Sequence, residues 1–320
     1  QSFTAPIQLR VSSFANGTTG YDEQSLKLSS ATTVALQSLA RQHKVTLNTV
    51  VQGAWAILLS RYSGEQDIVF GATSAGRPPA LVGSESMVGL FINTLPVRVQ
   101  VWGDELLIPW LQKLQAQQVE ELQYEYSPLV QVQGWSEVPR NLPLFESILV
   151  FENYPVDASL KEWATEMQIH EIRSVETTNY PITIKAGVGT ELSLEIVCDR
   201  SGFNTTIITR MLGHLQTLLE GMVANPHQSL CSLPLLSAAE HQQLVEWNNT
   251  QTDYPKDKCI HQLFEEQVEK TPDAVAVVFE SQQLTYRQLN QRANQLARYL
   301  QKCGVSPEVP VGICVHRSIE

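Results

Sequence analysis

The sequence has little of what would direct a protein to nucleic acid or to a membrane. Its 320 residues include 22 Lys and Arg against 33 Asp and Glu, which gives a formal net charge of -11. Because affinity for nucleic acid depends on basic side chains that neutralise phosphates, this balance argues against a nucleic-acid partner. No apolar run has the length of a transmembrane helix, and no signal-peptide pattern opens the sequence. We therefore expect neither nucleic acid nor a membrane among the partners.

Cysteines are also few, and their spacing favours no metal site or disulfide framework. There are five, an odd number without any Cys-x-x-Cys pair: Cys198, Cys231, Cys259, Cys303 and Cys314. Structural zinc sites and disulfide-rich domains use closer, paired spacings. A reducing compartment is the simplest interpretation, so we expect a cytoplasmic protein without a bound metal.

Hydrophobic periodicity predicts a first domain in which helices alternate with strands. Apolar residues at helical spacing predict helices over residues 29–43, 46–62, 105–124 and 205–223. Runs of β-branched and aromatic residues predict strands over residues 67–72, 90–101, 145–151, 168–175, 180–185 and 192–198. Polar, Gly-containing stretches over 1–20 and 76–86 are typical of a linker and a loop. This alternation indicates an α/β class with a mixed sheet.

The composition changes at Leu233-Pro234, and a second unit follows. We take the polar segment 236–256 as an interdomain linker, with a short helix over 240–247. The next pattern predicts a helix, a strand, a helix and a strand over residues 260–270, 274–279, 285–303 and 311–315. A strand–helix–strand order is typical of a parallel sheet. Since the chain begins on Gln1 and stops within the last predicted strand, we expect a piece of a longer protein.

Residues 1–235 carry, in order, five stretches that resemble the condensation domains of nonribosomal peptide synthetases. They read RYSG (61–64), DIVFG (67–71), AGRP (75–78), VGLFINTLPVR (88–98) and RNLPLFESILVFENYP (140–155). The fourth is similar to the fifth core motif of that family, and the last to its seventh. The resemblance implies the C-terminal lobe of a chloramphenicol-acetyltransferase-like fold.

Residues 257–320 resemble the opening of the adenylation (AMP-binding) domains of the same synthetases. The matching stretches are CIHQLFEEQVEKTPDAVAVVF (259–279), LTYRQLNQRANQLARYL (284–300) and VGICVHRSIE (311–320). They imply the first strand–helix–strand elements of an adenylate-forming domain. The connection over 233–255 is similar to the usual bridge between the two domains.

The resemblance implies a parent enzyme of secondary-metabolite and antibiotic biosynthesis. It would join aminoacyl or peptidyl thioesters into an amide and activate amino acids with ATP. Its implied partners are upstream and downstream peptidyl carrier domains, the rest of the synthetase and amino-acid thioesters. Its implied cofactors are 4'-phosphopantetheine on the carriers and ATP with Mg for adenylation; we expect none of them on this chain itself.

The catalytic motif of the family, two adjacent histidines followed by three residues and Asp-Gly, does not occur in this sequence. None of the seven histidines is next to another. Since the second histidine of that motif is the expected general base, we assign no catalytic residue and expect the chain alone to be inactive. Residues 16–20 (NGTTG) imitate a phosphate loop but lack the Pro-Lys-Gly that should follow, so we reject them as an ATP site.

What the resemblance does imply is one wall of the substrate tunnel. Six residues match family positions in and around a loop that bridges to the other lobe: Gly71, Arg77, Gly89, Phe91, Asn93 and Thr94. Asn93 and Thr94 would hydrogen-bond a pantetheine amide, or they simply terminate a strand whose core includes Phe91 and Ile92. Arg77 pairs with a carboxylate of the other lobe or is an ordinary surface residue. These alternatives stay open on the sequence alone.

Two further points leave the family assignment open in detail. The sixth core motif usually has His-Gln-Asp and Pro-Phe-Glu, whereas residues 124–138 read YEYSPLVQVQGWSEV. Heterocyclisation and epimerisation domains share the fold; continuation into an adenylation domain argues against epimerisation, and the absent lobe would decide on heterocyclisation. A non-catalytic remnant or docking module is the alternative from another class of function.

Overall fold

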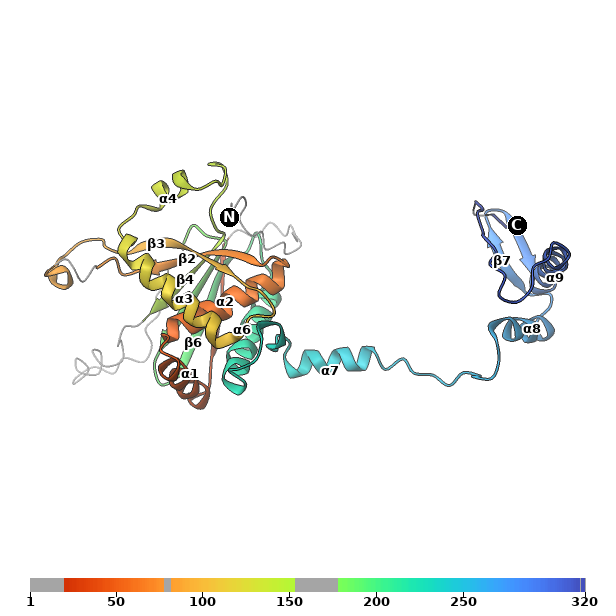
Figure 1. The fold of residues 1–320 in the computed structure, drawn as a ribbon, viewed down its shortest axis with the longest axis horizontal. Coiled ribbons are helices and arrows are strands. Elements are labelled where there is room, and N and C mark those ends of the chain that lie inside the picture. The colour runs from red at the N-terminus through yellow and green to blue at the C-terminus, as the bar shows by residue number, and fades with distance from the viewer. Residues whose placement is uncertain (1–19, 78–81, 153–177, 317, 320) are drawn as a thin grey trace. The chain divides into compact units, whose positions relative to one another are not determined.

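The computed structural model describes residues 20–77, 82–152, 178–316 and 318–319 (Figure 1). The chain divides between Glu246 and Trp247 into two compact units. The predicted strand over 168–175 and most of the predicted linker over 1–20 lie outside the described residues. Among the described residues, no helix combines the length and the apolar character that crossing a bilayer requires.

The first unit contains a six-stranded mixed sheet, whose strands are arranged in the order β1-β6-β5-β4-β2-β3. The strands are β1 (Tyr21–Lys27), β2 (Asp67–Ser74), β3 (Asn93–Gln100), β4 (Ser147–Glu152), β5 (Ile182–Val188) and β6 (Leu192–Asp199). Strand β4 runs parallel to β2 and to β5, and the other neighbours are antiparallel. The predicted mixed α/β class is therefore confirmed, although β1 was not predicted, because its polar sequence YDEQSLK leaves no residue of the strand fully buried.

Four helices supply the main core of the first unit against this sheet (Figure 1): α1 (Ser30–Gln42), α2 (Leu47–Ser63), α3 (Leu107–Glu121) and α6 (Thr205–Ala224). Helix α2 begins where the Thr46 hydroxyl accepts a hydrogen bond from the Thr49 amide, and ends where Gly64 takes a left-handed conformation. Every residue from Thr49 to Leu59 is buried. Each large apolar side chain buried in this way stabilises the fold by about 1.5–3 kcal/mol.

Helix α3 is shorter than predicted. Its last predicted turn is a 3-10 helix, η2 (Leu122–Tyr124). Leu106 and Leu122 flank the helix at its two ends and are more than half exposed. The middle of α3 is buried, with Trp110, Leu111 and Leu114 in the core.

A second, smaller apolar cluster is separate from the main core and includes residues of the central strands β2 and β4. Val69 and Ile148 come from β2 and β4, and Phe145 precedes β4. The segment after η2 covers them with Val138, Leu144 and flanking residues of α4 (Leu129–Trp135). This cluster places the 125–145 segment against the end of β2, where the candidate site begins.

Helix α7 (Ala238–Trp247) follows a short 3-10 turn, η3 (Leu230–Ser232), and agrees with the short helix predicted in the linker. The second unit contains α8 (Ile260–Lys270), β7 (Val275–Phe279), β8 (Gln282–Thr285) and α9 (Tyr286–Lys302). Strands β7 and β8 pair antiparallel in a hairpin before α9, and the sequence did not predict β8 as a strand. Residues 311–315, predicted as a strand, form no ladder with other described residues, and Ile313 and Val315 are largely exposed.

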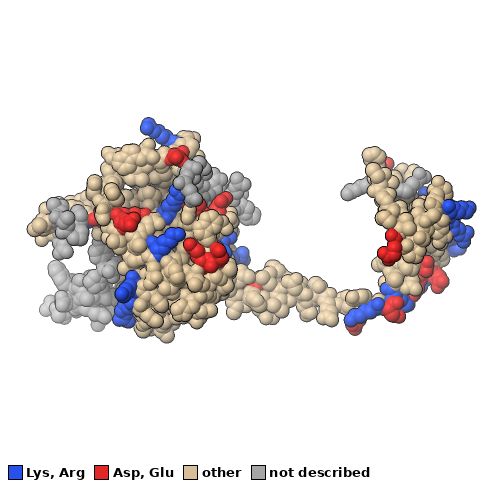
Figure 2. All heavy atoms as spheres, viewed as in Figure 1, with Lys and Arg blue, Asp and Glu red and all other residues tan. Residues whose placement is uncertain are grey.

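Charged side chains of both signs are interspersed over the face of the first unit that Figure 2 shows. That face carries no concentrated basic area.

Candidate functional site

Strands β2 and β3 hold the predicted site residues at one end of the sheet. Gly71 lies within β2, and Asn93 and Thr94 open β3, where they pair with Ser74 and Thr73. Arg77, Gly89 and Phe91 lie in the connection between the strands. We call its described part, residues 75–77 and 82–92, the β2–β3 loop; it extends beyond the ends of both strands (Figure 1).

Gly71 is required by packing. A Cβ atom at this position would lie 2.8 Å from Cγ2 of Ile148 and closer still to the ring of Phe145. That ring is itself fixed, because it stacks on Tyr180 with ring centroids 5.2 Å apart. Burial beneath the stack also raises the pKa of the Tyr180 hydroxyl. Gly71 therefore serves the cluster at the end of the sheet and offers no group to a ligand.

Arg77 contacts the loop to which it belongs. Its Nη1 donates to the carbonyl oxygens of Ser84 and Met87, the second at 3.1 Å. The guanidinium also lies over the Phe91 ring, 4.3 Å from its centroid, which is a cation–π distance. Within this lobe, Arg77 holds the two sides of the β2–β3 loop together.

Gly76 and Gly89 have different roles in this loop. Gly76 has a φ of +63°, and a Cβ there would overlap the carbonyl oxygen of Phe91. At Gly89 a Cβ would only touch the Phe91 ring at 3.4 Å, which is an ordinary contact. Of these two glycines, Gly76 is the one that close backbone approach requires.

Asn93 uses its side chain entirely within the protein. Its Nδ2 donates to the carbonyl oxygens of Glu125 and Ser127, both at 2.8 Å, and its Oδ1 accepts from the Thr94 amide at 2.9 Å. The hydroxyl of Thr94 makes no hydrogen bond to another described residue. Asn93 has therefore used both of its N–H donors and keeps one acceptor site on Oδ1, whereas the Thr94 hydroxyl can both donate and accept.

The idea that Phe91 and Ile92 belong to a strand core is wrong. Strand β3 begins at Asn93, so Asn93 and Thr94 start the strand instead of ending it. Ile92 is 60% exposed, and Val88 and Leu90 of the same loop are exposed almost completely. Large exposed apolar patches are often places where proteins interact.

The sequence did not predict the role of Glu125, which contacts both stems of this loop. We call Ser74, the last residue of β2, and Asn93, the first residue of β3, the two stems. Glu125 is 5% exposed, and its Oε2 accepts a hydrogen bond of 2.6 Å from the Ser74 hydroxyl. The same hydroxyl accepts from the Gly76 amide at 3.3 Å. The only sequence signal was the unusual form of the sixth core motif, which contains Glu125 and Ser127.

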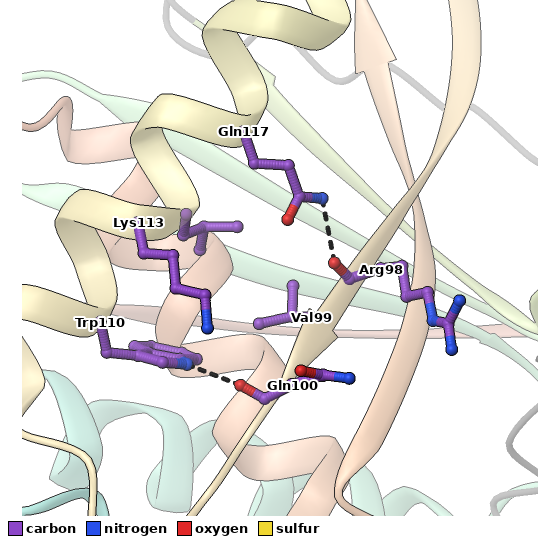
Figure 3. A pocket seen from close by; sticks show the side chains of 7 residues that line it. Arg98, Val99, Gln100, Trp110, Lys113 and Gln117 are labelled. Atoms are coloured by element: carbon purple, nitrogen blue, oxygen red, sulfur yellow. Dashed lines mark hydrogen bonds between the residues drawn. The ribbon is translucent and has the colours of Figure 1, made fainter. Parts of the chain in front are cut away.

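A separate pocket of about 340 Å³ lies between α3 and the edge strand β3 (Figure 3). Trp110 Nε1 donates to the carbonyl oxygen of Gln100 at 2.7 Å, and Gln117 Nε2 donates to that of Arg98 at 3.0 Å. Figure 3 shows the guanidinium of Arg98 pointing away from α3; it binds Asp67 with Nη2–Oδ2 at 2.6 Å, and this hydrogen bond raises the pKa of Arg98. None of the six predicted residues lines this pocket. The α3 side chains Trp110 and Gln117 instead cover outward-facing carbonyl groups of the edge strand β3.

Comparison with protein families identifies both parts of the chain. The Condensation domain family matches residues 4–245, and the AMP-binding enzyme family matches residues 264–320. The chain belongs to the condensation-domain family. It comprises condensation-domain sequence and the start of an adenylation domain, in the order found in nonribosomal peptide synthetases.

Relatives of this condensation-domain chain are peptide synthetases. A linear gramicidin synthase of Brevibacillus parabrevis is 53% identical over 304 residues, which cover 95% of this chain and 4% of that protein. Bacitracin synthase 3 of Bacillus licheniformis is 38% identical over 301 residues, which cover 93% of this chain and 5% of that protein. The chain therefore spans a small fraction of the length of these relatives.

Solved structures show the same fold. A four-domain nonribosomal peptide synthetase bound to AMP and glycine has a TM-score of 0.66 at 21% identity, covering 90% of this chain and 23% of that chain. The condensation domain of the Monacolin K polyketide synthase MokA has a TM-score of 0.59 at 18% identity, covering 72% of this chain and 55% of that chain. They confirm the predicted chloramphenicol-acetyltransferase-like fold of a condensation domain.

In the described part of the adenylation sequence, both helices begin with a capping box made by their own side chains. A helix N-terminus can bind phosphate through its free amides. At α9 the Gln288 amide donates to the Thr285 hydroxyl at 3.3 Å, and Gln288 Oε1 accepts from the Thr285 amide at 3.0 Å. At α8, Gln262 Oε1 accepts from the Cys259 amide at 2.8 Å.

Proposed function

We propose that residues 20–246 form the C-terminal lobe of an amide-forming condensation domain, and that the β2–β3 loop covers part of its substrate tunnel. The observation that carries the proposal is this loop, which Arg77 holds together while Val88 and Leu90 point outward. Isolated exposed apolar residues are common, but several on one internally braced loop fit a surface made for another part of the enzyme.

In the proposed reaction, the amine nitrogen of the acceptor attacks the carbonyl carbon of the donor thioester. The C–N bond forms, the C–S bond breaks, and the amine loses a proton as the carrier thiol is released. None of Gly71, Arg77, Gly89, Phe91, Asn93 and Thr94 is a base at neutral pH. They support positioning of the substrates, while the base comes from the lobe that carries the paired histidines.

Within this lobe the two polar candidates have distinct proposed roles. Asn93 makes hydrogen bonds to Glu125, Ser127 and Thr94 that use both of its N–H donors, so it fixes the start of β3. The Thr94 hydroxyl then lies beside it as a hydrogen-bonding group for an amide of the phosphopantetheine arm. Carrier domains and their thioesters are thus the proposed partners. ATP and Mg are proposed to act in the parent enzyme on residues other than those present here.

We also propose a cytoplasmic location and no condensation activity for this chain by itself. All five cysteines are free, which fits a reducing compartment. The inactivity is supported by the lack of adjacent histidines in the sequence.

The test is a charge placed on the exposed loop in a complete synthetase module that contains this chain. Leu90→Asp would bury a carboxylate where the loop meets its partner surface, so amide formation between loaded carriers should fall by about tenfold or more. Val130→Asp is the control, because Val130 is equally apolar and 81% exposed but lies on α4. Mass spectrometry of the carrier-bound products measures both. Equal activity of the two variants would contradict the proposal.

A further inference from the structure

Both stems of the β2–β3 loop are attached to one short segment of the chain. Ser74, the last residue of β2, and Asn93, the first of β3, face each other in the ladder. The Ser74 hydroxyl donates to the carboxylate of Glu125, and Asn93 donates to the backbone carbonyl of the same residue. Ser127 accepts the second hydrogen of the Asn93 amide. One residue therefore contacts the entry and the exit of the loop.

Glu125 is an unusual residue to find in this position. It lies between η2 and α4 and is 5% exposed, whereas Tyr124 and Tyr126 on either side are exposed to 62% and 74%. Glutamate is rarely buried unless a partner compensates it. Its partner is the Ser74 hydroxyl at 2.6 Å, which is the short distance of a hydrogen bond to a charged acceptor. The local sequence turns this one carboxylate inward, toward the loop.

The hydrogen bonds continue into the loop and the strand. Ser74 Oγ accepts from the Gly76 amide, and Gly76 is the residue whose backbone lies against the carbonyl of Phe91. On the other stem, Asn93 Oδ1 accepts from the Thr94 amide. Glu125 is therefore linked through Ser74 to Gly76, which precedes Arg77, and through Asn93 to Thr94. A displacement of Glu125 would be passed to both ends of the loop.

We propose that Glu125 is a positioning residue for condensation, which sets the placement of the β2–β3 loop by holding both of its stems. The inference rests on the proposed function, because it assigns the loop to the substrate tunnel. Glu125 touches no reacting atom in this scheme and acts through Ser74 and Asn93. Reacting groups must be held to a fraction of an ångström, so a loosened stem lowers turnover without removing any catalytic group.

The first test uses the 320-residue chain and needs no activity. In Glu125→Ala the Ser74 hydroxyl loses its acceptor, while the backbone carbonyl that accepts from Asn93 remains. Hydrogen exchange should therefore rise about tenfold in peptides that cover Gly76, and by less in peptides that cover Thr94. Peptides of β5 and β6 should not change. Glu125→Gln keeps an acceptor oxygen and should restore the protection. Glu120→Ala, at an exposed position on α3, is the matched control. No rise in Glu125→Ala, or an equal rise throughout the first unit, would overturn the proposal.

The second test measures amide formation in the complete synthetase module with both carriers loaded. Glu125→Ala should lower kcat by about tenfold, while Glu125→Gln and Glu120→Ala stay within about threefold of the parent. If the unmodified module forms no amide, the proposed function fails. If the unmodified module is active and Glu125→Ala is equally active although its loop has loosened, the proposed function stands and the role of Glu125 is refuted.

Discussion

Gly71 shows how one residue without a side chain can determine the packing of a sheet end. Strand β2 passes beneath the ring of Phe145, which is 2% exposed and stacked on Tyr180. Ile148 of β4 lies on the other side of the same space and is 3% exposed. Neither side chain can move into solvent, so no room exists for a methyl group on β2.

We therefore expect Gly71→Ala to destabilise the first unit by about 1–3 kcal/mol through overpacking. Urea unfolding followed by circular dichroism measures the change. Gly134→Ala is the control, since a Cβ at this helical position meets no atom within 4 Å and should be neutral or stabilising by up to about 1 kcal/mol. Phe145→Leu added to Gly71→Ala should recover part of the loss. If Gly71→Ala and Gly134→Ala had the same midpoint, the packing argument would be wrong.

At the scale of elements, helix α7 is fastened to α2 and α6 by a chain of polar side chains. Tyr62 Oη lies 2.9 Å from Nδ1 of His214, and Nε2 of His214 lies 2.9 Å from Oε2 of Glu240. Arg210 Nε binds the other carboxylate oxygen at 3.2 Å. Burial raises the pKa of Tyr62 to about 12, so its hydroxyl keeps the proton that it shares with His214. Glu240 is the member that belongs to α7.

Glu240 makes the attachment of α7 dependent on pH. Burial favours its neutral form, but the Ser237 amide and hydroxyl and His214 favour the carboxylate more, so the pKa of Glu240 lies below its usual value. A lowered pKa stabilises the folded form above the pKa of the unfolded carboxyl, and this contribution is lost as the pH falls through the folded pKa. We expect α7 to be protected from hydrogen exchange at pH 6 and to lose protection below about pH 4, after correction for chemical exchange.

The matching variant is Glu240→Gln, which removes the charge at every pH. At pH 6 its α7 peptide should exchange about tenfold faster than that of the parent, because one hydrogen bond to a charged group is weakened. Glu246→Gln lies on the same helix, where Gln242 Nε2 contacts the carboxylate in an exposed position, and should leave the protection unchanged. An α7 that stays equally protected in Glu240→Gln would show that the carboxylate does not hold the helix.

The sequence predicts an element well when the residues that define it are neighbours in the chain, and poorly when they are far apart. Helix α2 could be predicted closely because its cap Thr46, its apolar interior and its terminator Gly64 are all local. Strand β1 is polar along its length, so only its pairing with β6 defines it. The role of Glu125 depends on contacts with Ser74 and Asn93, which are 51 and 32 residues away, and no local pattern records them.

At the scale of the whole molecule, the two units differ in how much core they enclose. The first unit buries apolar side chains from four helices and from the central sheet. In the second unit Leu284 is the one buried side chain among the described residues. Leu296 of α9 is more than half exposed, and Ile260 and Ile313 are each exposed to 84%. The hydrophobic stabilisation available to the second unit is correspondingly small.

We therefore expect the second unit to open far more often than the first. Amides of β7 and α9 should exchange at least about 100-fold faster than those of β5 and β6, because a ladder with a single buried side chain opens locally without unfolding the rest. Native-state hydrogen exchange at peptide resolution compares the four elements in one sample. Leu284→Ala should remove the remaining protection of β7 and α9 while leaving β5 and β6 unchanged. Equal protection of both units would mean that the second unit gains its stability from contacts other than the core described for it.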